Sequence, residues 1–144
     1  MKIAYVDCFS GISGDMFLAA LLDAGLPLET LRAELDKLGL PEAFSLEASE
    51  TRKGSLRACL LHVDVPHLHS EGHQAEHDHD HAHQRSWKEI RTLIQASRLS
   101  ETVQQTSLAI FSRLAVAEGR VHGVPAEEVH FHEVGAVDSI VDIV

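Results

Sequence analysis

The sequence lacks the patterns that define several common protein classes. Its 144 residues include two cysteines, Cys8 and Cys59, and no C-x-x-C pair, so neither a disulfide framework nor a thiolate zinc site is expected. Acidic residues outnumber basic ones by 22 to 12, which gives a formal charge of −10 with neutral histidines. Without a basic patch to displace counterions, nucleic acid is not expected as a partner.

Long apolar runs are also missing. No segment approaches the roughly 20 residues of a membrane span, so no membrane partner is expected. The first seven residues have neither the apolar core nor the cleavage site of a secretory signal. Together with the low cysteine count, these absences predict a cytoplasmic protein. The 44% hydrophobic content is ordinary, and a chain of this length can bury the core of one domain.

The hydrophobic pattern predicts an α/β fold, with a small mixed sheet covered by four to five helices. Strands are expected at residues 2–7, 44–51 and 56–65, where β-rich residues run together or alternate with polar ones. The predicted helices are a short one from Met16 to Leu22, one that Pro27 opens at its first position and Gly39 ends, one behind a Ser86–Glu89 capping box, and a long one from Glu101 to about Val121.

Residues 67–85 divide the chain into two halves. They have almost no apolar content and are predicted to form a flexible, projecting, histidine-rich loop. Residues 1–66 are expected to form a strand-helix-helix-hairpin half that contains a glycine turn, and residues 86–144 a helical half that ends in a His-Phe-His-Glu segment. We expect one domain overall, truncated at residue 144, because the chain stops in an apolar run without a cap or turn.

Seven of the eleven histidines lie within this predicted loop. Neutral imidazole is a common ligand for nickel, copper and zinc, and the flexible spacing of these histidines implies no single coordination geometry. The composition therefore predicts several weak, exchangeable metal sites, the alternative being a merely soluble loop. The predicted ligands are His67, His69, His73, His77, His79, His81 and His83.

A glycine turn connects the first predicted strand to the first helix. Because Gly11 and Gly14 leave the backbone uncrowded, N–H groups at the helix start can cradle an anion, and Ser10 and Ser13 can add hydroxyl donors. The turn matches neither the Walker loop nor the dinucleotide fingerprint. It is a candidate phosphate or substrate site, the alternative being a tight connection with Ser13 as the helix N-cap.

Two aspartates bracket the glycine turn. Asp7, at the end of the first predicted strand, is a candidate metal ligand or general base, whereas Asp15 is expected to interact with the helix dipole. Cys8 is expected to be a small buried residue rather than a nucleophile, because no histidine neighbours it in the sequence. His62 and His122 are expected to be structural.

The last sixteen residues carry a dense group of potential ligands. His130 and His132 are two positions apart, so on an extended segment they point to the same side, and Glu133 follows them. Asp138 and Asp142 are four apart and share one face if this segment is helical. The spacing predicts a metal or catalytic site, the alternative being a structural histidine pair followed by a helix that Asp138 caps.

Two motifs carry a family resemblance, DCFSGISGDM at residues 7–16 and VHFHEVGAVDSIVDI at residues 129–143. Together with the histidine-rich insertion between them, they resemble the N-terminal region of the LarC family, in the same order over the whole chain. The family is the nickel insertase of nickel-pincer cofactor biosynthesis.

The resemblance implies a nickel chelatase, or cyclometallase, of the lyase class that acts in protein maturation. Such an enzyme inserts Ni²⁺ into pyridinium-3,5-bisthiocarboxylic acid mononucleotide in a reaction that depends on CTP with a divalent cation. The product is the cofactor of a lactate racemase.

The resemblance also implies that this chain does not act alone. Family members are longer, and their CTP and metal chemistry is associated with a C-terminal domain, so we expect that domain as a partner and an inactive fragment without it. The family supplies no established catalytic residues for this region. Assigning catalysis to Asp7, His130, His132, Glu133 and Asp138 is therefore an inference from their chemistry. A homo-oligomer is left open.

We expect the histidine loop to concentrate Ni²⁺ while the glycine turn and the terminal histidine group hold substrate and metal in one joint site. Two other functions fit the residues. One is a nickel-storage or metallochaperone module without catalysis. The other is a metal-dependent phosphoesterase that uses Asp7, His130, His132 and Asp138.

Overall fold

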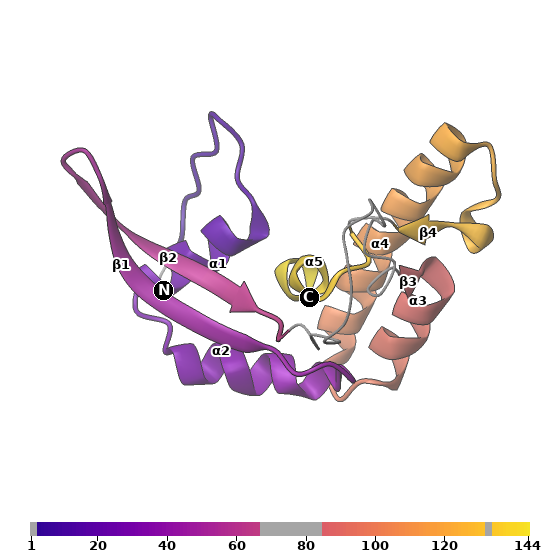
Figure 1. Ribbon diagram of the computed structural model, residues 1–144, viewed down its shortest axis with the longest axis horizontal. Coiled ribbons are helices and arrows are strands. Elements are labelled where there is room, and N and C mark those ends of the chain that lie inside the picture. The colour runs from indigo at the N-terminus through magenta and orange to yellow at the C-terminus, as the bar shows by residue number, and fades with distance from the viewer. Residues whose placement is uncertain (1–2, 67–84, 132–133) are drawn as a thin grey trace, which may run out of the picture.

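The computed structural model describes residues 3–66, 85–131 and 134–144 (Figure 1). The predicted histidine ligands at 67–83, and with them His132 and Glu133, lie outside the described residues. The described elements are α1 (Gly14–Asp23), α2 (Leu28–Leu35), η1 (Asp36–Leu38), β1 (Ser45–Lys53), β2 (Leu56–Asp64), β3 (Arg85–Ser86), α3 (Trp87–Ala96), α4 (Glu101–His122), η3 (Ala126–Glu128), β4 (His130–Phe131) and α5 (Val137–Ile143).

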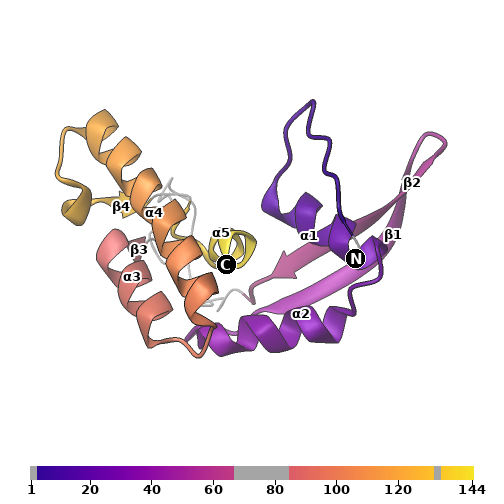
Figure 2. The ribbon, with the colours of Figure 1, turned by 180° about the vertical axis from the view of Figure 1, so that it is seen from behind.

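These elements form two groups with α5 between them. Figures 1 and 2 show α1, α2 and the β1–β2 hairpin on one side, and α3, α4 and the short β3–β4 sheet on the other. Helix α5, the last described helix, lies between these two groups.

Helix α1 ends at the predicted glycine, whereas α2 ends at Leu35 and the 3-10 helix η1 continues to the predicted stop at Gly39. Gly25 has a φ of +105°, and the Leu26 N–H donates to the Leu21 carbonyl at 3.0 Å, which closes α1 with a glycine in the left-handed region. Pro27 occupies the N-cap of α2 rather than the predicted first helical position. Leu31 and Leu35 form the buried side of α2.

Strands β1 and β2 form an antiparallel hairpin that runs from the Ser45–Asp64 pair to the Lys53–Leu56 pair. Gly54, with a φ of +63°, occupies the tight turn between them. One face of the hairpin, which carries the buried Leu61, packs against α1 and α2. The two strands predicted at 44–51 and 56–65 are thus confirmed, with small changes in their bounds.

The predicted strand at residues 2–7 is wrong for its described part. Residues 3–8 belong to no strand, and the side chains of Ile3 and Tyr5 are 79% and 89% exposed. The expected mixed sheet is therefore replaced by two separate two-stranded antiparallel sheets, β1–β2 and β3–β4. β-Propensity depends on context, and within the described chain no sheet edge pairs with this segment.

The second half begins with a complete capping box. The Ser86 hydroxyl accepts a bond from the Glu89 N–H, and the Glu89 carboxylate accepts one from the Ser86 N–H at 2.7 Å. Helix α4 begins after Ser100 and ends at Gly123, which has a φ of +69°. Within residues 3–66, 85–131 and 134–144, no helix combines the length and hydropathy that a bilayer span requires.

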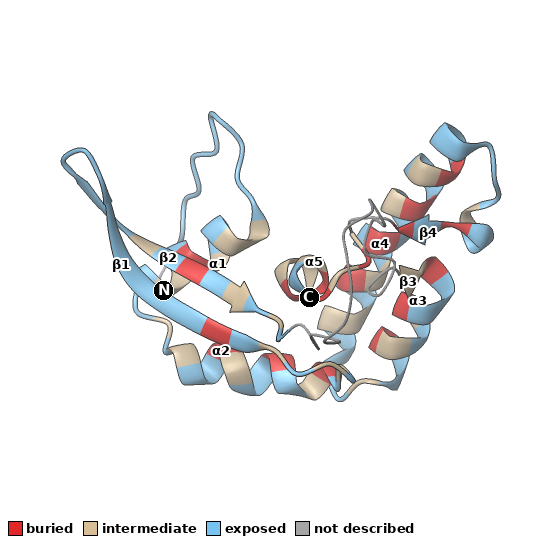
Figure 3. Ribbon diagram, in the orientation of Figure 1, coloured by how far each residue is buried: buried red, intermediate tan, exposed pale blue. Residues whose placement is uncertain are grey.

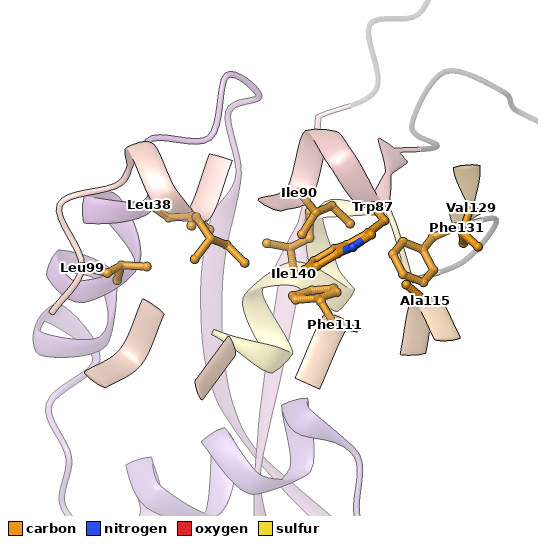
Figure 4. Close-up of a cluster of buried hydrophobic side chains, with 10 residues drawn as sticks. Leu38, Trp87, Ile90, Leu99, Phe111, Ala115, Val129, Phe131 and Ile140 are labelled. Carbon is orange, nitrogen blue, oxygen red and sulfur yellow. The ribbon is translucent and has the colours of Figure 1, made fainter. Parts of the chain in front are cut away.

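Two hydrophobic clusters share α5 (Figures 3 and 4). Ile140 packs with Phe111 and Phe131, whose ring centroids are 6.2 Å apart, in the cluster between α3 and α4. Val137 and Val141, on another side of the same helix, pack into the cluster that the first half forms around Leu35 and Leu61. Because each of these side chains is almost completely buried, α5 connects the two halves through apolar contact.

Candidate functional site

The glycine turn and the end of the chain meet where α1 crosses α5. A Cβ atom added to Gly14 would lie 2.3 Å from Cβ, 2.6 Å from Cγ and 2.9 Å from Cα of Asp142. No other amino acid fits at this position without moving α5. The structure therefore brings the two predicted motifs into direct contact, although they lie at opposite ends of the chain.

Asp142 places a carboxyl group in this contact. Burial raises its pKa above the ordinary aspartate value, and the charges of Asp15 and Asp138 raise it further, while the nearby Asp15 backbone N–H acts in the opposite direction. Its Oδ1 atom is buried and has no hydrogen-bond partner among the described residues. The junction thus holds a carboxyl group that binds its proton more tightly than an ordinary aspartate does.

Ser13 occupies the N-cap position of α1, but its side chain does not accept a capping hydrogen bond. The Ser13 hydroxyl donates to the Asp15 carboxylate, which also accepts a bond from the Met16 N–H at 2.8 Å. A phosphate at the start of α1 would share the space with the carboxyl groups of Asp15 and Asp142. This arrangement favours a cation or a hydrogen-bond donor over an anion.

A cavity of about 290 Å³ lies beside this junction, between the end of β2 and the start of α5. Val65 and Val137 supply part of its apolar lining, and His62, Asp64 and Asp138 supply its ionisable groups. Asp138 belongs both to this cavity and to the surroundings of Asp142, so the two features are neighbours. A pocket with two carboxylates and an imidazole suits a cation or a ligand rich in N–H or O–H donors.

The predicted residue His130 lies elsewhere. It is exposed on β4 and pairs with Ser86 across the small sheet. The hydrogen bonds from Ser86 lower the pKa of the Glu89 carboxyl, and His130 adds a smaller effect in the same direction. Figures 1 and 2 place β4 and α1 on opposite sides of α5. The alternation predicted for this segment is confirmed at Phe131, which is buried while His130 is exposed.

The other predicted site residues have mixed positions. Asp7, Ser10 and Gly11 are all exposed in the segment before α1, and the expected burial of Cys8 is wrong because Cys8 is exposed as well. No three His, Cys, Asp or Glu side chains among the described residues converge closely enough to hold a metal ion. The joint metal site stays a prediction, since part of it falls on residues outside the described chain.

Sequence reasoning gave no site role to three residues that lie at the cavity or the junction. His62 was expected to be structural, Asp64 attracted no interpretation, and Asp142 entered only through its spacing from Asp138. A usable signal was the alternation of β2, which puts His62 and Asp64 on one face of the hairpin. Nothing in the sequence shows that this strand end lies beside α5.

The chain matches a family of known proteins along almost its whole length. The family model described as nickel insertion protein matches residues 4–144. Relatives include a putative nickel insertion protein of Synechococcus sp. (strain JA-2-3B'a(2-13)), which is 48% identical over 144 residues. Another is the pyridinium-3,5-bisthiocarboxylic acid mononucleotide nickel insertion protein of Geobacillus kaustophilus, which is 49% identical over 144 residues.

The alignments cover 100% of this chain but 34% of each of these two relatives. The chain therefore spans about a third of the length of the curated relatives it matches. No solved structure matches the chain. The match over residues 4–144 includes both the glycine turn and the α5 segment, and it shows that the chain belongs to the nickel insertion protein family.

Proposed function

We propose that this chain forms the N-terminal region of a nickel insertase that metallates pyridinium-3,5-bisthiocarboxylic acid mononucleotide. The observation that carries the proposal is the 49% identity, over all 144 residues, to a relative whose name states this substrate and this metal. In the proposed reaction Ni²⁺ is a substrate, CTP with a divalent cation is consumed, and the product is the nickel-pincer cofactor of a lactate racemase. The enzyme belongs to the lyase class and works in the cytoplasm.

The geometry favours a role for this region in attracting and binding a cation for the full-length enzyme. The charges of Asp15 and Asp138 act on Asp142 where α1 meets α5, and the adjoining cavity adds Asp64 and His62, although these groups do not converge closely enough to hold a metal ion by themselves. A formal charge of −10 attracts cations to the whole surface. Because the chain spans about a third of its relatives, we propose that it contributes this environment and that catalysis requires the additional polypeptide.

The proposal is tested with a chimera in which this chain replaces the matched third of the Geobacillus kaustophilus relative. The chimera is incubated with the pyridinium mononucleotide, NiCl₂ and CTP with Mg²⁺, and the nickel-containing product is measured by mass spectrometry. We expect product from the chimera and none from the 144-residue chain alone. A correctly folded chimera that binds nickel yet forms no product would contradict the proposal.

Two variants test the junction within the same assay. Asp138→Asn removes a carboxylate that faces both the cavity and Asp142, and we expect it to lower the rate about tenfold or to raise the nickel concentration needed. Asp36→Asn, an exposed carboxylate on η1, is the matched control and leaves the rate unchanged. Equal rates for both variants would remove the junction from the proposed function.

A nickel-storage role is the second candidate, because seven histidines lie between residues 67 and 83. Deleting residues 67–84 from the chimera distinguishes the two functions. If the histidines are only a reservoir, product formation falls when nickel is scarce and recovers in excess nickel. If they belong to the reaction, product formation falls at every nickel concentration.

A further inference from the structure

Exposed large apolar side chains are concentrated at the start of the chain. Of the thirteen such residues among the described ones, seven lie between residues 3 and 17. We call these residues the N-terminal strip: Ile3, Tyr5, Val6, Phe9, Ile12, Met16 and Phe17. Single exposed apolar residues are normal on a protein surface, whereas such a concentration marks an interaction site.

In the part of the chain that the structure describes, the backbone at the start of the strip is unpaired as well. Among the described residues, no backbone hydrogen bond joins residues 3–7 to another element, and the local bond nearest to them is that from the Gly11 N–H to the Cys8 carbonyl at 2.9 Å. Figures 1 and 2 show the segment before α1 as a loop that projects past the end of that helix. Residues 3–6 are Ile, Ala, Tyr and Val, and three of these four residue types, Ile, Tyr and Val, are enriched in β-strands.

We propose that residues 3–8 are a docking strand that adds to the open edge of a sheet. This sheet belongs to the polypeptide that the curated relatives carry in addition to the matched region. Phe9, Met16 and Phe17 pack on the same body and complete an apolar seam. Pairing satisfies the free N–H and C=O groups, and burial of the large apolar side chains favours docking. The inference rests on exposure and backbone pairing and is independent of nickel insertion.

The length of the relatives and the net charge of this chain favour the additional polypeptide of the relatives as the occupant. About two thirds of each of these relatives lies outside the matched region. In the relatives, that additional polypeptide is long enough to form a body with a sheet edge. A second copy of this chain is disfavoured because each copy carries a formal charge of −10, and docking would bring two like charges together. Between positions 3 and 17 the chain adds the carboxylates of Asp7 and Asp15 and no basic residue.

Hydrogen–deuterium exchange by mass spectrometry tests the docking strand. In the 144-residue chain, we expect peptides that cover residues 3–8 to exchange at the rate of unprotected amides, because their N–H groups have no backbone partner among the described residues. In the chimera with the Geobacillus kaustophilus relative, we expect the same peptides to exchange about 100-fold more slowly. Peptides from α4 serve as the folding control and are protected equally in both proteins.

Substitutions test whether the side chains of the N-terminal strip form the apolar seam. The double substitution Tyr5→Asp and Phe9→Asp is expected to restore fast exchange of residues 3–8 in the chimera. Leu56→Asp, at a 73% exposed position near the hairpin turn, is the matched control and leaves the protection unchanged. An environment-sensitive apolar dye provides a second measurement on the chain alone: it binds the 144-residue chain and its Leu56→Asp variant, and it does not bind the double variant.

Three outcomes would overturn the proposal. The first is fast exchange of residues 3–8 in the chimera while α4 is protected. The second is absence of dye binding to the chain alone, or dye binding that the double variant leaves unchanged. The third is protection of these residues in the 144-residue chain that rises with its concentration, with a dimer in sedimentation, because the occupant would then be a second copy.

Discussion

Gly14 and Asp142 are in contact so close that a methyl group on Gly14 would overlap the Asp142 side chain, with 2.3 Å between the two Cβ atoms. This contact joins the first turn of α1 to the last turn of α5. It also brings the carboxyl group of Asp142 to the charges of Asp15 and Asp138. The glycine at position 14 is thus required by packing, whatever ligand the turn binds.

Gly14→Ala is expected to destabilise the chain by about 1–3 kcal/mol, because the neighbouring Cα and Cβ atoms belong to a helix and cannot swing aside. Urea denaturation measures the change in the free energy of unfolding. Asp142→Gly removes the two nearest overlapping atoms, so the cost of Gly14→Ala should shrink in that background. An equal cost in both backgrounds would show that the two residues do not touch.

Asp142→Asn is expected to stabilise the chain at pH 7 by up to about 1 kcal/mol, once solvent screening is allowed for. Burial, followed by the charge of Asp15, raises the Asp142 pKa above 3.8, so the folded chain holds this proton at a higher pH than the unfolded chain does. The free energy of unfolding therefore falls as the pH rises from about 3.8 through the raised pKa, and the penalty is complete above it.

Unfolding experiments between pH 3 and 8 measure this effect. The Asn variant lacks the fall in stability across that window, whereas Asp64→Asn, which changes an exposed carboxylate on β2, retains it. A carboxyl resonance of Asp142 that titrates at or below 3.8 in a nuclear magnetic resonance experiment is incompatible with the prediction.

Ser86→Ala is expected to cost about 1 kcal/mol, because it removes the hydroxyl that caps α3. The same change raises the Glu89 pKa, since the Ser86 hydroxyl and backbone bonds are the main reasons why that pKa is lowered. The Glu89 contribution to stability is present above pH 4.5 and is lost as the pH falls through the lowered pKa, and this dependence weakens in the variant. Ser100 caps α4 but has no partner carboxylate. The Ser100→Ala variant is therefore expected to lose stability, while the dependence of its stability on acid pH stays unchanged.

Arg85→Met is expected to cost about 1–3 kcal/mol, because Arg85 pairs with Glu42 and donates to the Gly135 carbonyl at 2.9 Å with little exposure. Lys37→Met, in the more exposed pair with Glu34, is the control and costs less than about 1 kcal/mol. Thermal and urea unfolding compare the two. A double variant with Glu42→Leu should recover part of the loss, and no recovery would argue against the pair.

Nickel binding by the 144-residue chain is expected to depend mainly on the seven histidines at 67–83. Equilibrium dialysis with NiCl₂ should show several weak sites, most of which disappear when residues 67–84 are deleted. Binding falls as the pH drops below about 6.5, because protonated imidazole cannot coordinate a metal. His62→Ala, a single histidine at the cavity, retains most of the binding, and an undiminished nickel content after the deletion would refute the prediction.

Local signals in the sequence predicted much of the fold. Helices α3 and α4 begin at the serine caps and α4 ends at Gly123, because capping and left-handed glycine geometry depend on neighbouring residues. The β1–β2 hairpin follows from alternation around Gly54. The two long motifs indicated the family, and the match over residues 4–144 confirms it.

The sequence by itself therefore determined local features, namely where most helices and the hairpin begin and end. It also determined to which family the chain belongs. The tertiary structure decided which residues meet. Within the terminal segment, His130 pairs with Ser86 on one side while Asp142 packs on Gly14 on the other, because α5 fills two apolar clusters at once. Residues 3–8 have the composition of a strand but join no sheet edge in the described part of the chain, and strand formation needs a partner backbone that composition alone does not supply.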